Sequence, residues 1–259
     1  MDMHSPLQVR EVFHIEFLRW LGRKAKPENY AVKGGVNLRF FFKSFRYSED
    51  MDIDVRDIKI FQLQDTVMTI LNNRTFRENL KPFGIADIRA PDITKAKQTE
   101  TTQRFKAHII LSSGEDLFTK IEFSRRGFSG DVVTGLLDDR ILRVYKLAPL
   151  LASHYDCFSA AAQKIGALAS RAQTQARDIF DLVILSSQCD GWPAHTVIDE
   201  EKVQAALGRI AEVGFEQFRD TVVSYLSVED QKAYSTEASW KEAQQKCSTF
   251  IKEARKTHA

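Results

Sequence analysis

In the stretch Ser48-Glu49-Asp50-Met51-Asp52-Ile53-Asp54, acidic and apolar side chains alternate from Asp50 onward. Strict alternation predicts a β-strand from Met51 to Val55, because successive side chains of a strand point to opposite faces. The apolar residues then face a core, and the aspartates share the other face. Two such carboxylates repel each other, and hard oxygen ligands of this kind suit Mg²⁺ or Mn²⁺. The alternative is an exposed edge strand with solvated aspartates.

A glycine pair stands a short way upstream of this acidic strand. Tyr30-Ala31-Val32 is predicted as a strand that ends in Lys33-Gly34-Gly35, and residues 37–42 are predicted as a helix. Glycines between a strand and a helix let backbone amides approach a phosphate closely, and the helix N-terminus favours an anion. A phosphate-binding turn and a metal-binding carboxylate pair are two parts of one phosphoryl-transfer site. A pair of divalent ions there can clamp a phosphate and activate an attacking hydroxyl.

Glu122 is a candidate third carboxylate. In Thr119-Lys120-Ile121-Glu122-Phe123, alternation buries the apolar residues and turns Lys120 and Glu122 the other way. If this strand lies beside the acidic strand, Glu122 can share a metal ion with the aspartates. Alternating Glu and Lys on a solvated face is the simpler interpretation.

A second group of charged residues lies in an apolar helical segment of the C-terminal half. Its members are Lys164, Arg171, Arg177, Asp178 and Asp181. Charges on a mostly buried helix need partners or a role, and Lys164 and Arg171 could neutralise a triphosphate. The alternative is a surface ion-pair cluster, which contributes little to stability.

Apolar spacing organises the rest of the chain into two parts. Helices are predicted at about residues 6–23, 58–80, 148–187, 200–213, 215–226 and 238–254. Further strands are predicted at about residues 85–93, 104–111, 117–124 and 140–145. The short turns between consecutive strands indicate an antiparallel meander. We therefore predict an α+β fold with a mixed or antiparallel sheet in residues 1–147, followed by a helical domain in residues 148–259.

The charge of the chain bears on whether it binds nucleic acid. The chain has 259 residues and a net charge of only +2, so the overall charge gives no argument for nucleic acid. Between Lys95 and Arg126, however, seven basic residues stand against four acidic ones. This stretch could hold phosphate, although a solvated strand face is the simpler interpretation.

Cysteine usage and hydropathy bear on location. Cys157, Cys189 and Cys247 are widely spaced and odd in number, which predicts neither a disulfide framework nor a zinc site and suggests a reducing compartment. The sequence has no apolar run of the roughly 18 residues that span a bilayer. We expect a cytoplasmic protein without membrane contact.

The motifs resemble those of a known family. Lys33-Gly34-Gly35-x-Asn37-Leu38, followed by Arg46-x-Ser48-x-Asp50-x-Asp52, resembles the first motif of the AbiEii/AbiGii toxin nucleotidyltransferases. Lys164-x-x-Ala167-Leu168-x-x-Arg171, followed by Arg177-Asp178-x-x-Asp181-Leu182, resembles the later motifs of that family. The order and approximate spacing agree, and the similarity runs from about Val9 to about Leu185.

The resemblance implies a DNA-polymerase-β-like nucleotidyltransferase core that transfers a nucleoside monophosphate from an NTP, with Mg²⁺ or Mn²⁺, to an acceptor. With the residues above, it gives a set of expected sites. The catalytic residues are Asp50, Asp52, Lys164, Asp178 and Asp181, and the metal ligands are Asp50, Asp52 and Glu122. The nucleotide-binding residues are Lys33, Gly34, Gly35, Asn37, Ser48, Arg171 and Arg177. Where the family usually has Ser or Thr after the glycines, Val36 stands here. Either Asn37 or Ser48 replaces the missing hydroxyl, or backbone amides mainly hold the triphosphate.

The resemblance also suggests an acceptor and a partner. Family members are often toxins of toxin–antitoxin or phage-defence pairs, and some modify tRNA ends. We therefore expect transfer to an RNA hydroxyl, at a tRNA 3′ end, and a cognate antitoxin protein. The alternatives are a small-molecule acceptor such as an aminoglycoside, a protein side chain as acceptor, and a catalytically inactive binding module.

Overall fold

The computed structural model describes residues 4–193 and 198–256, and the chain forms two compact units. The α/β unit comprises Met1–Phe41, Tyr47–Phe128 and Val132–Tyr155. The helical unit comprises Phe42–Arg46, Ser129–Asp131 and Asp156–Ala259. The α/β unit thus continues beyond residue 147, where the sequence suggested a domain boundary.

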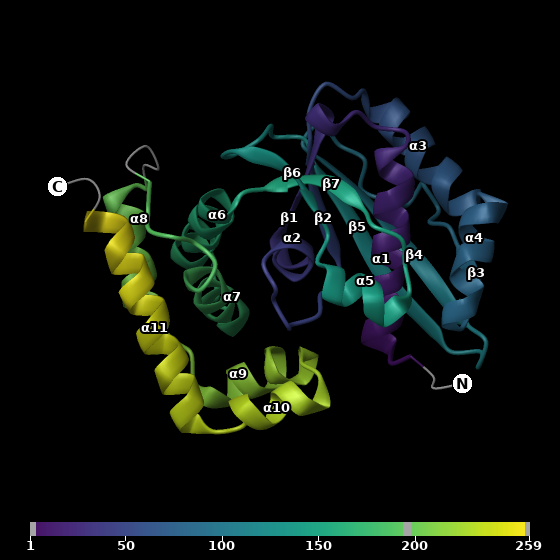
Figure 1. The fold of residues 1–259 in the computed structure, drawn as a ribbon. Coiled ribbons are helices and arrows are strands. Elements are labelled where there is room, and N and C mark those ends of the chain that lie inside the picture. Colours follow the sequence, from purple (N-terminus) through teal and green to yellow (C-terminus); the bar gives the residue numbers. More distant parts are fainter. Residues whose placement is uncertain (1–3, 194–197, 257–259) are drawn as a thin grey trace. The chain divides into compact units, whose positions relative to one another are not determined.

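A seven-stranded mixed sheet forms the α/β unit, with the strand order β3-β4-β5-β2-β1-β7-β6 (Figure 1). The strands are β1 (Tyr30–Lys33), β2 (Met51–Val55), β3 (Ile85–Arg89), β4 (Thr102–Leu111), β5 (Asp116–Ser124), β6 (Val132–Leu136) and β7 (Leu151–Tyr155). The predicted antiparallel meander β3-β4-β5 is confirmed. The acidic strand β2 lies parallel to β5 and antiparallel to β1, so it occupies the centre of the sheet rather than an edge.

Helices supply the rest of this unit. They are α1 (Pro6–Gly22), α2 (Gly34–Phe41), α3 (Ile60–Asn72), α4 (Arg74–Leu80) and α5 (Asp139–Tyr145), with short 3₁₀ turns η1 (Pro27–Asn29) and η2 (Lys81–Phe83). Helix α1 begins where the sequence places an N-cap, because the Ser5 hydroxyl accepts from the Gln8 amide and the Gln8 side chain accepts from the Ser5 amide. Helices α1, α3 and α4 pack together (Figure 1) and bury an aromatic cluster that includes Phe13 and Phe76.

Two predicted elements differ from the structure. Residues 58–80 form two helices rather than one, because Asn73 is extended and its side chain caps α4 by accepting from the Phe76 amide. Residues 140–145 were predicted as a strand, but they form α5. The reason lies just upstream, where the Asp138 carboxylate accepts from the Arg140 amide and starts a helix.

The prediction of no strand after residue 148 is also wrong. Strand β7 pairs in parallel with β1 and antiparallel with β6. Neither pairing joins residues that are close in sequence. Residues Ala152 to Tyr155 are all buried, so the strand lacks the alternation that identifies a half-buried strand. This strand, the second from one edge of the sheet, carries Tyr155, whose hydroxyl reaches Asp54 on β2.

The helical unit consists mainly of α6 (Cys157–Ser170), α7 (Ala176–Ser186), α8 (Glu200–Arg209), α9 (Phe215–Thr221), α10 (Val228–Tyr234) and α11 (Glu237–Lys256), with 3₁₀ turns η3 (Ile210–Glu212) and η4 (Val223–Tyr225). Its core contains Trp240 stacked on Phe218 at a ring-centroid distance of 4.3 Å. The Trp240 indole N–H also donates to the Val213 carbonyl at 2.8 Å. The helices therefore close around an aromatic core of their own.

The cysteines do not match the expectation from sequence. Cys157 and Cys189 form a disulfide that joins the first residue of α6 to the turn after α7. Their separation of 32 residues gives no local signal, because the pairing depends on how the two helices fold back on each other. Cys247 is a buried free thiol.

Within the described residues, no helix is both long enough and apolar enough to cross a membrane.

His14 on α1 makes folding stability sensitive to acid. Burial lowers the pKa of His14 to about 3, the Arg10 charge adds to this and the Asp50 charge opposes it. The unfolded chain binds a proton near pH 6.5, so stability contributed by neutral His14 is present above that pH and lost as pH falls. Between pH 7 and 5 the wild type should lose about 2 kcal/mol relative to His14→Gln in denaturant unfolding. Parallel pH profiles for the two proteins would contradict this assignment.

Candidate active site

Strand β2 presents its aspartates as the alternation predicts. Met51 and Ile53 are fully buried in the core, and the acidic side chains lie on the opposite face. Asp54 is not free for a ligand, because Lys33 Nζ lies 2.5 Å from its Oδ1 and the Tyr155 hydroxyl donates to its Oδ2 at 2.6 Å. Asp54 and Lys33 therefore fix this end of the strand, and Asp50 and Asp52 remain as the carboxylates of the site.

Gly34 lies against Asp52. Its φ of +67° starts α2 in a conformation that favours glycine, and a Cβ at this position would stand 2.9 Å from Asp52 Oδ2. The α2 N-terminus and the Asp52 carboxylate are thus direct neighbours. Only a residue without a side chain fits between them.

Asp50 is held from two directions. Lys120 on β5 places its Nζ 2.7 Å from Asp50 Oδ2 and donates its backbone N–H to Oδ1 at 3.1 Å. The Ser48 hydroxyl donates to the Asp50 carbonyl at 2.9 Å. In this arrangement Ser48 orders the chain before the strand, whereas the sequence suggested a contact with nucleotide.

Glu122 is the direct neighbour of Asp52. The two residues are Cα partners on the parallel strands β2 and β5. Arg104 on β4 is the next residue in this row, and its guanidinium lies 2.6 Å from Glu122 Oε2. The structure thus brings Asp52 and Glu122 together, as the third-carboxylate hypothesis requires, and adds a cation that the hypothesis did not include.

Neighbouring acidic and basic side chains act on Asp52 in opposite directions. Burial raises the pKa of Asp52, with further raising by Glu122 and Asp50 and opposition from Lys33 and Lys120. Within the described residues, no three His, Cys, Asp or Glu side chains are grouped closely enough to hold a metal ion. The donor chemistry nevertheless fits Mg²⁺ or Mn²⁺, because carboxylate oxygens are their preferred ligands and a divalent cation relieves the same repulsion.

The residues after the glycine pair contribute to structure. Val36 is 1% exposed and belongs to the core, so the position where the family usually has a hydroxyl is filled by packing. Asn37 is fully buried, and its side-chain amide donates to the Tyr155 carbonyl at 3.1 Å while its oxygen faces His154 Nδ1. Asn37 thus joins α2 to β7.

The second predicted group assembles within the helical unit. Asp181 is fully buried, pairs with Lys164 at 2.6 Å and receives two N–H groups of Arg46 at 3.0 to 3.1 Å. Asp178, also fully buried, contacts Lys164 at 3.1 Å. Arg171 Nε lies 2.7 Å from Asp178 Oδ2 as an ion pair without hydrogen-bond alignment. The cluster is therefore an internal charge network rather than a surface one.

Arg46 is the member that the sequence reasoning missed. Burial alone would raise the pKa of Asp181, but Arg46 and Lys164 together lower it. The signal was present in Arg46-x-Ser48-x-Asp50, where a basic residue precedes the acidic strand. Arg177, in contrast, is exposed and forms no ion pair with a described acidic residue, so its predicted neighbour Asp181 is taken by other cations.

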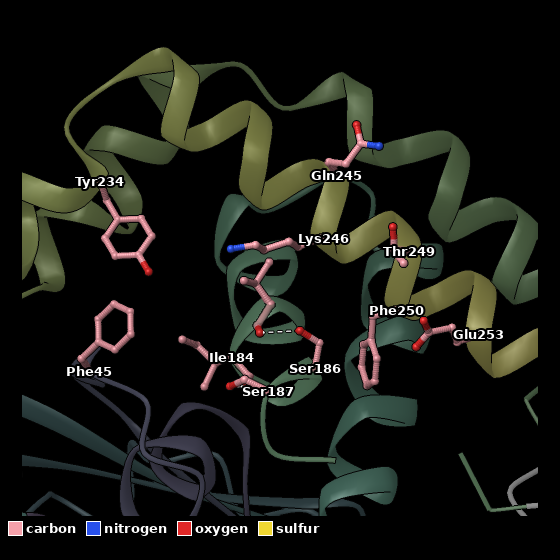
Figure 2. A pocket seen from close by; sticks show the side chains of 11 residues that line it. Phe45, Ile184, Ser186, Ser187, Tyr234, Gln245, Lys246, Thr249, Phe250 and Glu253 are labelled. Atoms are coloured by element: carbon pink, nitrogen blue, oxygen red, sulfur yellow. Dashed lines mark hydrogen bonds between the residues drawn. The ribbon is translucent and has the colours of Figure 1, made fainter. Parts of the chain in front are cut away.

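The helical unit also contains a pocket of about 550 Å³. Figure 2 shows Phe45 and Tyr234 at one end, with ring centroids 5.4 Å apart, and Glu253 toward the other. Among the described residues that line it, none belongs to the predicted nucleotide or metal site. Phe45 contacts Phe180 edge-on and so holds the segment that carries Arg46.

The two sets of aspartates should respond differently to loss of charge. Asp181→Asn leaves Arg46 and Lys164 buried with too little negative charge, so the free energy of unfolding should fall by about 3 to 5 kcal/mol. Asp52→Asn removes a carboxylate whose pKa is raised, so at pH 7 it should leave stability unchanged or increase it. Urea unfolding of both variants measures this, and equal destabilisation would contradict the assignment.

Comparisons with known proteins identify the family of the chain. Residues 16–255 match the family model described as nucleotidyl transferase AbiEii toxin, type IV TA system. Among curated proteins no sequence matches the chain.

Solved structures share the fold at low sequence identity. A candidate nucleotidyltransferase from H. pylori gives a TM-score of 0.58 at 16% identity, covering 98% of this chain and 96% of that one. MenT4, a nucleotidyltransferase toxin from Mycobacterium tuberculosis, gives 0.58 at 16% identity, covering 97% and 87%. These matches confirm the expected nucleotidyltransferase fold, and the family match covers most of the chain. The protein therefore belongs to the AbiEii family of nucleotidyl transferase toxins of type IV toxin–antitoxin systems.

Proposed function

We propose that this enzyme transfers a nucleoside monophosphate from an NTP to a hydroxyl of an RNA acceptor, a tRNA 3′ end, with Mg²⁺ or Mn²⁺ bound by Asp50 and Asp52. Glu122 completes the ligand set. A cognate antitoxin is the expected protein partner, and the cytoplasm, where NTPs and tRNA occur, is the expected location. The proposal rests on the family and on the geometry of the α/β unit.

One observation carries the proposal: the Asp52 carboxylate lies so close to Gly34 that a Cβ on Gly34 would stand 2.9 Å from Asp52 Oδ2. A group on the carboxylate is therefore also beside the backbone amides that begin α2. Those amides favour an anion, and the carboxylates favour a cation. A metal-bound triphosphate presents both charges in one molecule.

The residues of the chain divide the chemistry among them. The α2 N-terminus receives phosphate oxygens, and Asp50 and Asp52 hold the divalent cation, which when bound neutralises charge on the phosphates and on the attacking oxygen. Lys120 and Arg104, which balance the carboxylates in the structure, are the side chains that must move from them. The acceptor hydroxyl loses its proton to solvent, its oxygen bonds to the α-phosphorus, and the bond to the pyrophosphate oxygen breaks. Positioning and charge neutralisation supply most of the rate.

The helical cluster has a positioning role in this proposal. Lys164, Asp178 and Asp181 satisfy one another's charges, so they hold Arg46 and Arg171 rather than reacting themselves. Arg46 stands four residues before Asp50, and its clamp on Asp181 fixes the start of the segment that leads to the acidic strand. Arg177 is exposed on α7, and its role in binding nucleotide stays a prediction.

The transfer reaction tests the proposal directly. Purified protein is incubated with Mg²⁺, each α-³²P-labelled NTP and total tRNA, and the products are separated on a denaturing gel. We expect label on RNA with wild type and none with Asp50→Ala/Asp52→Ala, because the variant loses the metal ligands. The NTP that gives the label is the preferred substrate.

The other outcomes are equally informative. Label on the protein itself would replace RNA with a protein side chain as acceptor. Label transferred only to an added aminoglycoside would point to a small-molecule acceptor. Absence of label in every arm would contradict transferase activity for this chain and leave a binding module.

Alanine variants of Gly34 and Gly84, two glycines with positive φ, isolate the role of the Gly34–Asp52 contact. Gly34→Ala introduces both an unfavourable positive φ and a Cβ 2.9 Å from Asp52 Oδ2, whereas Gly84→Ala at φ +82° meets nothing within 4 Å. Each variant should lose about 1 to 2 kcal/mol of stability from backbone strain. Only Gly34→Ala should lose transferase activity, by about 100-fold or more, because it displaces a metal ligand. Equal activity of the two variants would contradict the shared phosphate and metal site.

A further inference from the structure

Three rows of side chains cross the open face of the sheet. The Cα partners across β2, β5 and β4 give one row of Asp52, Glu122 and Arg104. Lys120 contacts Asp50 on one side and pairs with Lys106 on the other, which gives a second row. The third row runs across β5, β4 and β3 as Phe118, His108 and Arg89.

The core lies on the opposite face of these strands. Phe105, Ala107 and Ile109 of β4, and Ile121 and Phe123 of β5, are fully buried there. Alternation therefore leaves the three rows on a face that the helical layer of α1, α3 and α4 does not cover. The candidate metal ligands and the basic side chains of β4 share this face. Two strand spacings, about 10 Å, separate β2 from β4.

A groove of about 640 Å³ lies at the basic end of these rows. It is lined by β4, by the end of β3 and by the loop after β3, and its cationic residues are Arg89, Lys95, Lys97, Arg104 and Lys106. Asp92 is the acidic residue among those that line it, and it lies 3.6 Å from Lys95. Lys97 and Lys106 pair with no acidic side chain in the described part of the chain. The groove therefore has positive charge available for an anion.

An exposed aromatic side chain stands beside the groove. Phe118 is 49% exposed in the middle of β5, on the same face, and Lys106 Nζ lies 4.1 Å from its ring centroid. Lys106 covers part of this ring, and about half of the side chain stays accessible to a ligand. A basic groove with an accessible aromatic ring is the combination that binds single-stranded nucleic acid, because the cations follow the phosphates and a base stacks on the ring.

We propose that the groove and Phe118 form the acceptor-binding surface, which holds a single-stranded RNA end. Lys97 and Lys106 contact phosphates, and Phe118 stacks against a base. Arg104 lies on β4 between the groove and Glu122, so the terminal hydroxyl lies toward Asp50 and Asp52. The direction in which the RNA lies on the surface rests on the proposed function, whereas the existence of the binding surface does not.

Charge alone would also admit an acidic segment of a protein. Phe118 favours RNA, because an acidic peptide has no planar base to stack on a phenyl ring. The two occupants therefore differ in how they respond to loss of Phe118 and to loss of the lysines.

Fluorescence anisotropy with a labelled unstructured RNA of about ten nucleotides, without NTP or metal, measures the surface directly. Lys97→Ala/Lys106→Ala should weaken binding roughly tenfold. The slope of log K against log salt concentration should become less steep by about 1.4, because two phosphate contacts are lost. Phe118→Ala should weaken binding about tenfold with little change in that slope. Arg104 is left unchanged in these variants because it also neutralises Glu122.

Lys59 and Phe61 provide a matched control. Lys59 Nζ lies 5.9 Å from the centroid of Phe61, a ring 64% exposed on α3, outside the groove. Lys59→Ala/Phe61→Ala removes the same kinds of group from another surface and should bind RNA like wild type. Thermal melting of all variants verifies that they are folded.

The outcomes separate this inference from the proposed function. Equal affinities of the groove and control variants would overturn the surface even if the enzyme transfers nucleotides to RNA. Loss of binding in the lysine variant but not in Phe118→Ala, with displacement of the RNA by poly-glutamate, would assign the groove to an acidic protein segment and overturn the inference. If transfer occurs, the groove variants should raise the KM for RNA and leave the KM for NTP unchanged.

Discussion

Repulsion among carboxylates on a central strand is the constraint on which the α/β unit depends. Asp50 immediately precedes β2, Asp52 and Asp54 lie on one face of it, and Glu122 stands beside Asp52 on the neighbouring strand. The fold balances this charge with a cation for each position that it can reach. Lys33 with Tyr155 satisfies Asp54, Lys120 contacts Asp50, and Arg104 contacts Glu122.

Asp52 is the carboxylate that this balance leaves least satisfied. Burial and its acidic neighbours raise its pKa, and Gly34 keeps a side chain away from its oxygen. An unfavourable environment for one charged group is typical of functional sites. It lowers the stability of the free protein, and a ligand of opposite charge relieves it. The cations on the neighbouring carboxylates then serve the unliganded protein. They keep the sheet together when no divalent cation is present.

The sequence predicted the parts of this site that depend on local patterns. Alternation in β2 and β5 placed Asp52 and Glu122 on one face, and the glycine pair marked the start of α2. It could not predict the partners that come from distant segments. Tyr155 reaches Asp54 across 101 residues, from a strand without alternation, and Arg46 reaches Asp181 across 135. The Cys157–Cys189 pair was missed for the same reason. The helix at residues 139–145 was missed although its signal, the capping Asp138, is local.

Neither compact unit is a continuous piece of the chain. The helical unit includes Phe42–Arg46 and Ser129–Asp131, which interrupt the α/β unit in sequence. A fragment beginning at Asp156 would lack Arg46, and Asp181 would keep Lys164 as its remaining cation from this network. Recombination at a single crossover therefore cannot exchange either unit intact between relatives. We expect the two units to be inherited together, so that new acceptors arise through changes on surfaces rather than by shuffling of domains.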